Sequence, residues 1–312
     1  MKDRTLAQEI TAKPSGSEAI REAVYKYMFG TAGVAALLLI LLIFVFLFRE
    51  AFSAVSAIGL DRFFSLSHPV WNPTAAGEGS YSVIPLITGS LLVALPAVMI
   101  AGAVGILCGI YIAEVASQDT REYLKPILEL LGAIPTIVLG FLIFTFVMPL
   151  VKMMFPGASH LNALLGALGI ALMIIPTIAS LTEESLHAVP MSLRMASYGL
   201  GATRLQTVLM VVLPGAVRGI SSAVLLGFAR ALGETIIVVI VTGNAGIITA
   251  DILSSTRTMT AAIVSEMGEV TEGSAHYSAL FFIGIILFLF TFALNLWAEW
   301  LIGKKRKKGG EA

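Results

Sequence analysis

Charge is scarce in this sequence. Of its 312 residues, 13% are charged and 57% are hydrophobic, and the mean hydropathy is +0.91. Soluble domains carry about 25% charged and about 45–50% apolar residues. A chain this apolar has too few polar groups to cover a surface that faces water. The composition therefore excludes an ordinary soluble domain and indicates an integral membrane protein.

Several chemical features are also missing. Cys108 is the only cysteine, which excludes a disulfide framework and a cysteine metal cluster. The formal net charge is zero, which argues against nucleic acid as a partner. No Gly-x-x-x-x-Gly-Lys-Ser/Thr phosphate-binding loop occurs. We therefore expect a chain that is not itself an enzyme, with no catalytic residue, no metal and no bound cofactor. If ATP drives its function, a separate ATPase polypeptide uses the ATP and Mg.

Long apolar runs are present instead. A helix needs about 20 apolar residues to cross a hydrocarbon core about 30 Å thick. Six runs reach or approach that length, which predicts an all-α integral membrane fold with six transmembrane helices. Pro96, Pro135 and Pro176 lie within the second, third and fourth runs, where each is expected to bend or unwind its helix. The six runs cover residues 31–48, 86–113, 127–151, 161–181, 217–242 and 279–302.

Basic residues are shared unevenly between alternate sides of these spans. With the N-terminus inside, the outer segments hold only Arg49, Arg62, Lys152 and Arg257, and most other lysines and arginines lie on the inner side. The positive-inside rule then predicts that both termini are cytoplasmic, and the first 28 residues lack the apolar core of a signal peptide. The predicted parts are a cytoplasmic segment (1–28), a transmembrane domain (29–303) and a basic cytoplasmic tail (304–312) that contacts anionic lipid.

Three connections are long enough to have structure of their own. The inner one, 182–216, is rich in helix formers but too polar to cross lipid. It is broken by Pro190 and closed by Pro214, which predicts two short helices at the cytoplasmic face. They serve either as a docking site for a partner or as an amphipathic surface on lipid. The two outer loops are 49–85 and 243–277, and the second is polar enough to be a re-entrant loop at a substrate entrance.

Two ionisable residues lie within the fifth span. Arg230 and Glu234 are four residues apart, so we expect them on one helical face. A charge at the bilayer centre costs at least about 2.5–3.5 kcal/mol. The pair is therefore either a structural ion pair or an anion site, in which the guanidinium binds phosphate-like oxygens and Glu234 holds Arg230 until substrate arrives.

The inner segment carries a recognisable motif. Met195-Ala-Ser-Tyr-Gly-Leu-Gly201, followed by Val211-Val-Leu-Pro214, resembles the EAA loop of binding-protein-dependent ABC importers. That pattern is Glu-Ala-Ala, three residues, Gly, nine residues, then Ile-x-Leu-Pro, and here Met and Val replace Glu and Ile. The resemblance implies the type I ABC importer permease fold, with a glycine that lets two short helices cross closely. The residues implied to contact the ATPase are Ala196, Ser197, Gly201, Leu213 and Pro214.

Further motifs narrow the resemblance to one family. The stretch Gly227-Phe-Ala-Arg-Ala-Leu-Gly-Glu-Thr235, together with Trp71-Asn-Pro73 and Thr258-Met-Thr, is similar to PstC-type permeases of the phosphate importer. Membership implies a multi-pass protein of the prokaryotic inner membrane that imports inorganic phosphate. The implied partners are a PstA-type sister permease, two copies of the ATPase and an extracytoplasmic phosphate-binding protein. The implied substrate pathway includes Arg230 and Glu234, with Thr235 and Asn244 on the outer half of the same helix.

Three alternatives remain open from the sequence. The same architecture could carry molybdate or sulfate, because a guanidinium binds any of these oxyanions. The chain could also report phosphate status to a signalling partner. An ion-coupled secondary carrier is a third class, but such carriers usually contain two similar halves, and no internal repeat is evident here.

Overall fold

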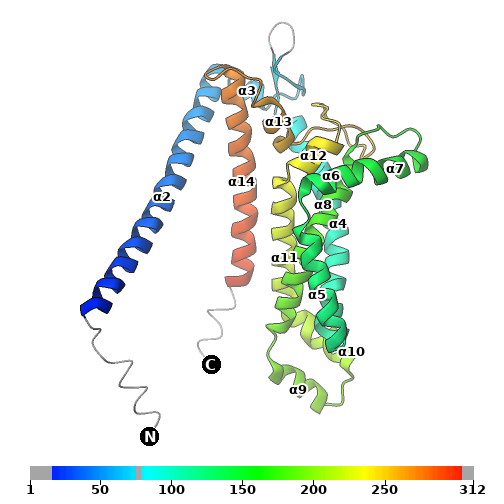
Figure 1. The fold of residues 1–312 in the computed structure, drawn as a ribbon. Coiled ribbons are helices and arrows are strands. Elements are labelled where there is room, and N and C mark those ends of the chain that lie inside the picture. Colours follow the sequence, from blue (N-terminus) through cyan, green and yellow to red (C-terminus); the bar gives the residue numbers. More distant parts are fainter. Residues whose placement is uncertain (1–15, 75–78, 304–312) are drawn as a thin grey trace. The chain divides into compact units, whose positions relative to one another are not determined.

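The computed structural model describes residues 16–74 and 79–303, and this part of the chain is mainly helical (Figure 1). The predicted basic tail, 304–312, and residues 1–15 of the predicted N-terminal segment lie outside the described residues. The α-helices are α2 (Gly16–Ile58), α3 (Leu60–Phe63), α4 (Ile84–Ile110), α5 (Gln118–Ala133), α6 (Thr136–Leu142), α7 (Met148–Met154), α8 (Ala163–His187), α9 (Met191–Gly199), α10 (Arg204–Thr207), α11 (Leu213–Gly233), α12 (Ile236–Val241), α13 (Met259–Glu266) and α14 (Ala275–Gly303).

Three wider π-helical turns and one small hairpin complete the described elements. The π-helical turns are η1 (Tyr111–Val115), η2 (Ile143–Val147) and η3 (Val208–Val212), and each continues a neighbouring α-helix. Strands β1 (Trp71–Asn72) and β2 (Ser80–Tyr81) pair antiparallel, with Trp71 opposite Tyr81. The chain divides into two units after Arg49, and the described residues of the first unit, 16–49, are the N-terminal part of α2.

Six helical stretches of the described chain are long and apolar enough to cross a membrane, which confirms the predicted number of spans. All of these spans except the third are longer than the apolar runs that predicted them. They comprise Ile20–Ile58, Ile84–Val115, Thr136–Met154, Ala163–His187, Arg204–Gly233 and Ala275–Leu301.

The prediction of the third span, 127–151, was wrong at its start. The chain breaks at Ile134, whose backbone is extended, and Pro135 forms the N-cap of α6. A proline disfavours helical geometry in the residue before it and has no N–H to continue the hydrogen-bond ladder. Pro96 and Pro176, in contrast, remain inside the continuous helices α4 and α8.

The predicted boundaries of the inner segment, 182–216, were also partly wrong. Helix α8 continues to His187, and Pro190 is the N-cap of α9, as the predicted break requires. Pro214 does not close the segment, because it lies inside the continuous helical stretch Arg204–Gly233. Two short helices, α9 and α10, do form, but α10 leads directly into a span.

The π-helical turn η3 explains how Pro214 fits inside a helix. Proline lacks the N–H that an α-helix needs and its ring clashes with the carbonyl four residues earlier. In η3 the helix widens by one residue, and the Leu213 N–H bonds to Val208 O, five residues back. The same arrangement occurs at η2, where the Met148 N–H bonds to Ile143 O just before Pro149. Each of these two wide turns, η2 and η3, therefore has a proline two residues beyond its end.

Helices α4, α8 and α11 run side by side and form the main core (Figure 1). Gly105 and Gly109 let α4 approach α8, since a Cβ at Gly109 would lie 2.7 Å from Ala179 O. Gly227 of α11 faces Ile178 of α8 in the same way, with 2.9 Å between a built Cβ and Cδ1. Small residues four apart are the usual device for close helix packing in lipid. Helix α8 is thus held between α4 and α11.

Candidate functional site

Arg230 lies in the last turn of α11 and is exposed in the isolated chain. Its Nη1 donates a hydrogen bond to Oγ1 of Thr177 on α8, at 3.1 Å. Among the described residues, no carboxylate forms an ion pair with this guanidinium. A guanidinium has five N–H donors, so most of its donors are available to an anion.

The prediction that Arg230 and Glu234 share a helical face was wrong, as was the single span 217–242. Helix α11 ends at Gly233, and Glu234 is extended, with φ −66° and ψ 136°. Its Oε1 accepts the N–H groups of Ile236 and Ile237 at 3.1 and 3.2 Å. The carboxylate thus caps the start of α12, whose first N–H groups have no intrahelical partner. The glutamate stabilises a helix break and does not hold the arginine.

Residues of α13 support this break from the side. The hydroxyl of Thr260 donates to the backbone oxygen of Glu234 at 2.7 Å, and Thr258 Oγ1 lies 3.1 Å from Thr260 Oγ1. The N–H of Met259 donates to Oγ of Ser90 on α4 at 2.9 Å. Thr235 is the N-cap of α12, and its hydroxyl donates to Gly233 O at 3.2 Å. The structure therefore brings Thr177, Arg230 and the capped break together at the end of α11.

Asn244 is not part of this cluster. It was predicted on the same helix as Thr235, but it follows the end of α12 in a left-handed conformation, with φ 61°. Its N–H bonds to Thr256 O at 3.2 Å, and its Oδ1 is buried without a hydrogen-bond partner. It lines a cavity of about 800 Å³ that is formed by the segments 70–74, 244–247 and 257–276. The cavity includes residues of both predicted outer loops.

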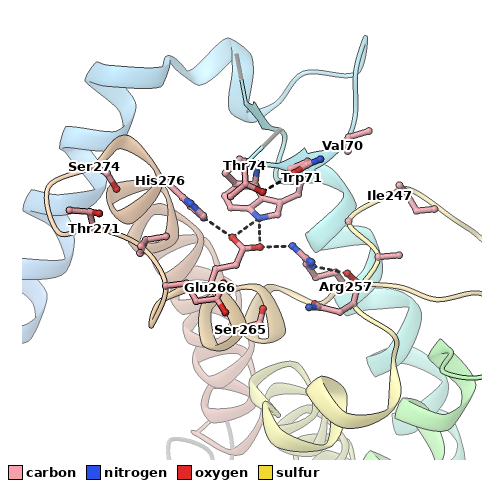
Figure 2. Close-up of a pocket in the computed structure, with 17 residues that line it drawn as sticks. Val70, Trp71, Thr74, Ile247, Arg257, Ser265, Glu266, Thr271, Ser274 and His276 are labelled. Carbon is pink, nitrogen blue, oxygen red and sulfur yellow. Dashed lines mark hydrogen bonds and ion pairs between the residues drawn. The ribbon is translucent and has the colours of Figure 1, made fainter. Parts of the chain in front are cut away.

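Glu266 is the polar centre of this cavity (Figure 2). Its carboxylate accepts the indole N–H of Trp71, with 3.0 Å to each oxygen, and lies 2.7 Å from Nε2 of His276. Arg257 forms an ion pair with the same carboxylate and donates its Nε to Asn244 O at 2.9 Å. One side chain at the end of α13 thus joins β1, the 244–257 loop and the start of α14.

The sequence placed Glu266 and Trp71 in the two predicted outer loops but did not predict their contact, because 195 positions separate them. Trp71 is 2% exposed and its ring packs edge-on against Tyr81, across the hairpin. Burial raises the pKa of Tyr81, and the charge of Arg62 partly offsets this effect. Trp71 belongs to a small buried cluster formed by residues of the two outer loops and of α14.

The residues of the EAA-like motif lie on α9 and the turn after it. Ala196 is exposed on α9, and Ser197 Oγ lies 2.9 Å from Thr207 Oγ1. Gly201 has φ +84° and follows the helix end, where the N–H of Ala202 bonds to Ser197 O at 3.2 Å. This is a Schellman ending, in which the left-handed residue is usually glycine.

The expected role of Gly201 in a close helix crossing was therefore wrong. Nothing lies within 4 Å of a Cβ built there, and the positive φ is what requires glycine. Leu213 and Pro214, the other two motif residues, begin α11 after the wide turn η3. Ala196, Ser197 and Gly201 thus lie at the exposed helix, whereas Leu213 and Pro214 lie at the entry to a span.

Comparison with solved structures defines the class of protein. The fold matches a bacterial ABC transporter involved in the import of the acidic polysaccharide alginate, with a TM-score of 0.61, 15% identity, and 90% of this chain and 97% of that chain covered. It also matches the MetNI methionine ABC transporter, with a TM-score of 0.53, 16% identity, and coverage of 70% and 95%. The chain has the fold of a type I ABC importer permease.

Sequence comparison then gives the family. Residues 105–307 match the model of the binding-protein-dependent transport system inner membrane component, and the chain belongs to that family. It is 34% identical to the probable ABC transporter permease protein YqgH of Bacillus subtilis, over 76% of each chain. It is 30% identical to the phosphate transport system permease protein PstC of Mesorhizobium japonicum, over 91% of this chain and 90% of that one. It is therefore a multi-pass protein of the prokaryotic inner membrane.

Proposed function

We propose that this chain is a permease subunit for the import of inorganic phosphate. The observation that carries the proposal is Arg230, a guanidinium at the end of a broken span with no carboxylate partner among the described residues. Several similar proteins are named phosphate transport system permease PstC, including those of Mesorhizobium japonicum and Pasteurella multocida. An arginine fork binds phosphate oxygens through parallel N–H donors, and the Thr177 hydroxyl lies beside it.

The proposal includes an orientation and a set of partners. Both termini face the cytoplasm, as the distribution of basic residues predicts. A PstA-type sister permease completes the translocation path, and a separate ATPase dimer supplies the energy. The ATPase contacts α9 and its turn, and an extracytoplasmic phosphate-binding protein delivers substrate near the two outer loops. In this arrangement Arg230, Glu234, Thr235 and Asn244 belong to the path, with Glu234 acting through the shape of the break.

Uptake into proteoliposomes tests the proposal. The vesicles would contain this chain with its sister permease and ATPase, with binding protein on the opposite face. Labelled phosphate is offered with or without excess sulfate or molybdate. We expect uptake that needs ATP and resists both competitors.

The other outcomes separate the alternatives. ATP-driven uptake of sulfate or molybdate in place of phosphate would retain the permease and overturn the substrate. An Arg230 variant that loses uptake but still reports phosphate status to the cell would show that signalling and transport are separable.

A further inference from the structure

The short helix α9 is attached to the rest of the chain by hydrogen bonds of two of its side chains. None of its nine residues is buried. Seven are exposed, and the two that are partly covered are Arg194 and Ser197. An amphipathic helix is usually held by apolar residues packed into a core, and α9 lacks these. These two side chains and the connecting backbone are therefore direct routes by which a force on α9 can reach the spans.

Arg194 makes the stronger of the two attachments. Its Nη1 lies 2.8 Å from both carboxylate oxygens of Glu114, and its Nη2 donates to Leu186 O at 2.8 Å. Glu114 is 5% exposed and lies in η1, the continuation of α4. Leu186 lies in the last turn of α8. One guanidinium therefore joins α9 to the ends of two spans at the same time.

The ends of α4 and α8 that Arg194 contacts are both held in place by further interactions. Arg121 donates to the carbonyl oxygens of Ile112 and Ala113, both at 2.9 Å, which satisfies groups at the wide turn before Glu114. Ala113 and Leu186 belong to one buried cluster with residues of α11. Gly109 brings α4 against α8 one turn away, with a built Cβ 2.7 Å from Thr182 Cβ. The two helix ends that Arg194 contacts are thus packed as one body.

Helix α8 connects this contact to the candidate site. Leu186 at one end accepts from Arg194, and Thr177, nine residues earlier, accepts from Arg230. At about 1.5 Å per residue these contacts are about 14 Å apart along one helix. A displacement of α9 that moves α8 as a rigid element would be felt at Arg230.

We propose that Arg194 and Glu114 form the joint through which α9 moves α4 and α8, so that both are positioning residues for transport. The inference rests on the proposed function, in which α9 receives motion from the ATPase. Neither residue contacts substrate, and neither is needed for nucleotide chemistry on the ATPase. Loss of the joint uncouples ATP hydrolysis from uptake and leaves the ATPase docked.

The test uses the complete complex in proteoliposomes and measures phosphate taken up per ATP hydrolysed. Wild-type complex that fails to import phosphate would count against the proposed function and not against the joint. For Arg194→Gln and Glu114→Gln we expect this ratio to fall at least tenfold, with ATPase activity and yield of assembled complex retained. The double variant should be no worse than either single one, because residues that act as a unit are not additive. Arg218→Gln is the matched control, since Arg218 is exposed on α11.

A purely structural role gives a different result. Assembly, melting temperature, ATPase activity and uptake would then fall together, with the ratio unchanged, and the joint would be rejected. If the glutamine variants do not assemble, Arg194→Lys decides the question. A lysine keeps the charge but cannot bridge Glu114 and Leu186 O as a planar fork does. A wild-type ratio in that variant would overturn the proposal.

Discussion

At the scale of single residues, the polar groups of this chain have roles that their spacing did not reveal. Arg230 and Glu234 are four positions apart, yet one contacts Thr177 and the other caps α12. Spacing predicts a shared face only while a helix continues, and here it ends at Gly233. Arg230 could be selected as a candidate site residue from its place in an apolar run. Its neighbours could not, because Thr177 lies on α8, more than fifty residues earlier.

Replacing Arg230 with lysine should reduce phosphate uptake by about ten- to hundredfold. A lysine is a point charge without the planar fork, and a hydrogen bond to a charged group contributes about 1.5–3 kcal/mol. Initial uptake rates in proteoliposomes measure the effect. Thr177→Val, which removes only the neighbouring hydroxyl, should cost less. Wild-type rates in Arg230→Lys would contradict a direct contact between this side chain and the anion.

Glu234 should tolerate glutamine better than leucine. A glutamine amide oxygen can accept the N–H groups of Ile236 and Ile237, so the cap survives without the charge. Leucine leaves both donors without this acceptor, at a cost of about 0.5–2 kcal/mol. Thermal unfolding of the purified protein should therefore show a lower midpoint for Glu234→Leu than for Glu234→Gln. Equal losses in both variants would indicate that the negative charge itself is required.

At the scale of elements, apolar length predicted six spans, but the breaks between helices follow local chemistry. Pro135 separates two helices, whereas Pro214 lies inside a continuous helical stretch because the wide turn η3 precedes it. Both prolines look alike in a hydropathy profile. The cavity between the outer loops could not be predicted, because its residues meet only through tertiary packing. Glu266 is the clearest case, since three partners from three segments converge on one carboxylate.

Removing the charge of Glu266 should loosen the contact between the two outer loops. Glu266→Gln keeps an acceptor for the Trp71 indole but loses the ion pair with Arg257. A buried charge left without its partner is costly, at about 3–5 kcal/mol, and with 18% of the Arg257 side chain exposed a smaller loss is expected. The melting temperature should fall, and the fluorescence of Trp71 should shift towards that of a hydrated indole. The measurement uses a variant in which Trp297 and Trp300 are replaced by phenylalanine, so that Trp71 is the only tryptophan left to fluoresce.

Close packing of α4 on α8 gives a second test at this scale. Gly109→Ala introduces a Cβ 2.7 Å from Ala179 O, so backbone must move. Overpacking of this kind costs about 1–3 kcal/mol. Gly284→Ala is a control in another span, because nothing lies within 4 Å of its built Cβ. We expect a lower melting temperature for the first variant and little change for the second. Similar stability of the two variants would contradict the described packing.

At the scale of the whole molecule, the family and the fold agree with what composition and motif predicted. The orientation in the membrane stays a prediction, and the single cysteine makes it testable. In a Cys108→Ser background, new cysteines can be introduced at Ser67, in a predicted outer loop, and at Leu200, which is 91% exposed after α9. A membrane-impermeant maleimide should label the first in intact cells and the second only after permeabilisation.

The reverse labelling pattern would place α9 outside and contradict an ATPase contact there. The same cysteine at position 200 also reports on assembly. The proposed ATPase contact at α9 and its turn predicts that bound ATPase slows this labelling in permeabilised membranes. The sequence motif predicted α9 and its turn as the surface for the ATPase, but the reason for the glycine at position 201 is seen only in the backbone conformation. Gly201 is needed for a left-handed helix ending, and spacing alone cannot distinguish that from close packing.

The wide turn η3 has a consequence for the register of the chain. It contains one residue more than an α-helical turn, between α9 on one side and the full length of α11 on the other. Deleting one residue from 208–212 would let the turn close to ordinary α-helix, and α11 would keep nearly the same rotation relative to α10, because five residues of a π-helical turn wind by about the same angle as four of an α-helix. A deletion within the regular helix α11, before Arg230, would instead rotate that residue by about 100° away from Thr177. The wide turn is therefore a place where the chain can lose a residue and still present the same face of its fifth span to the substrate.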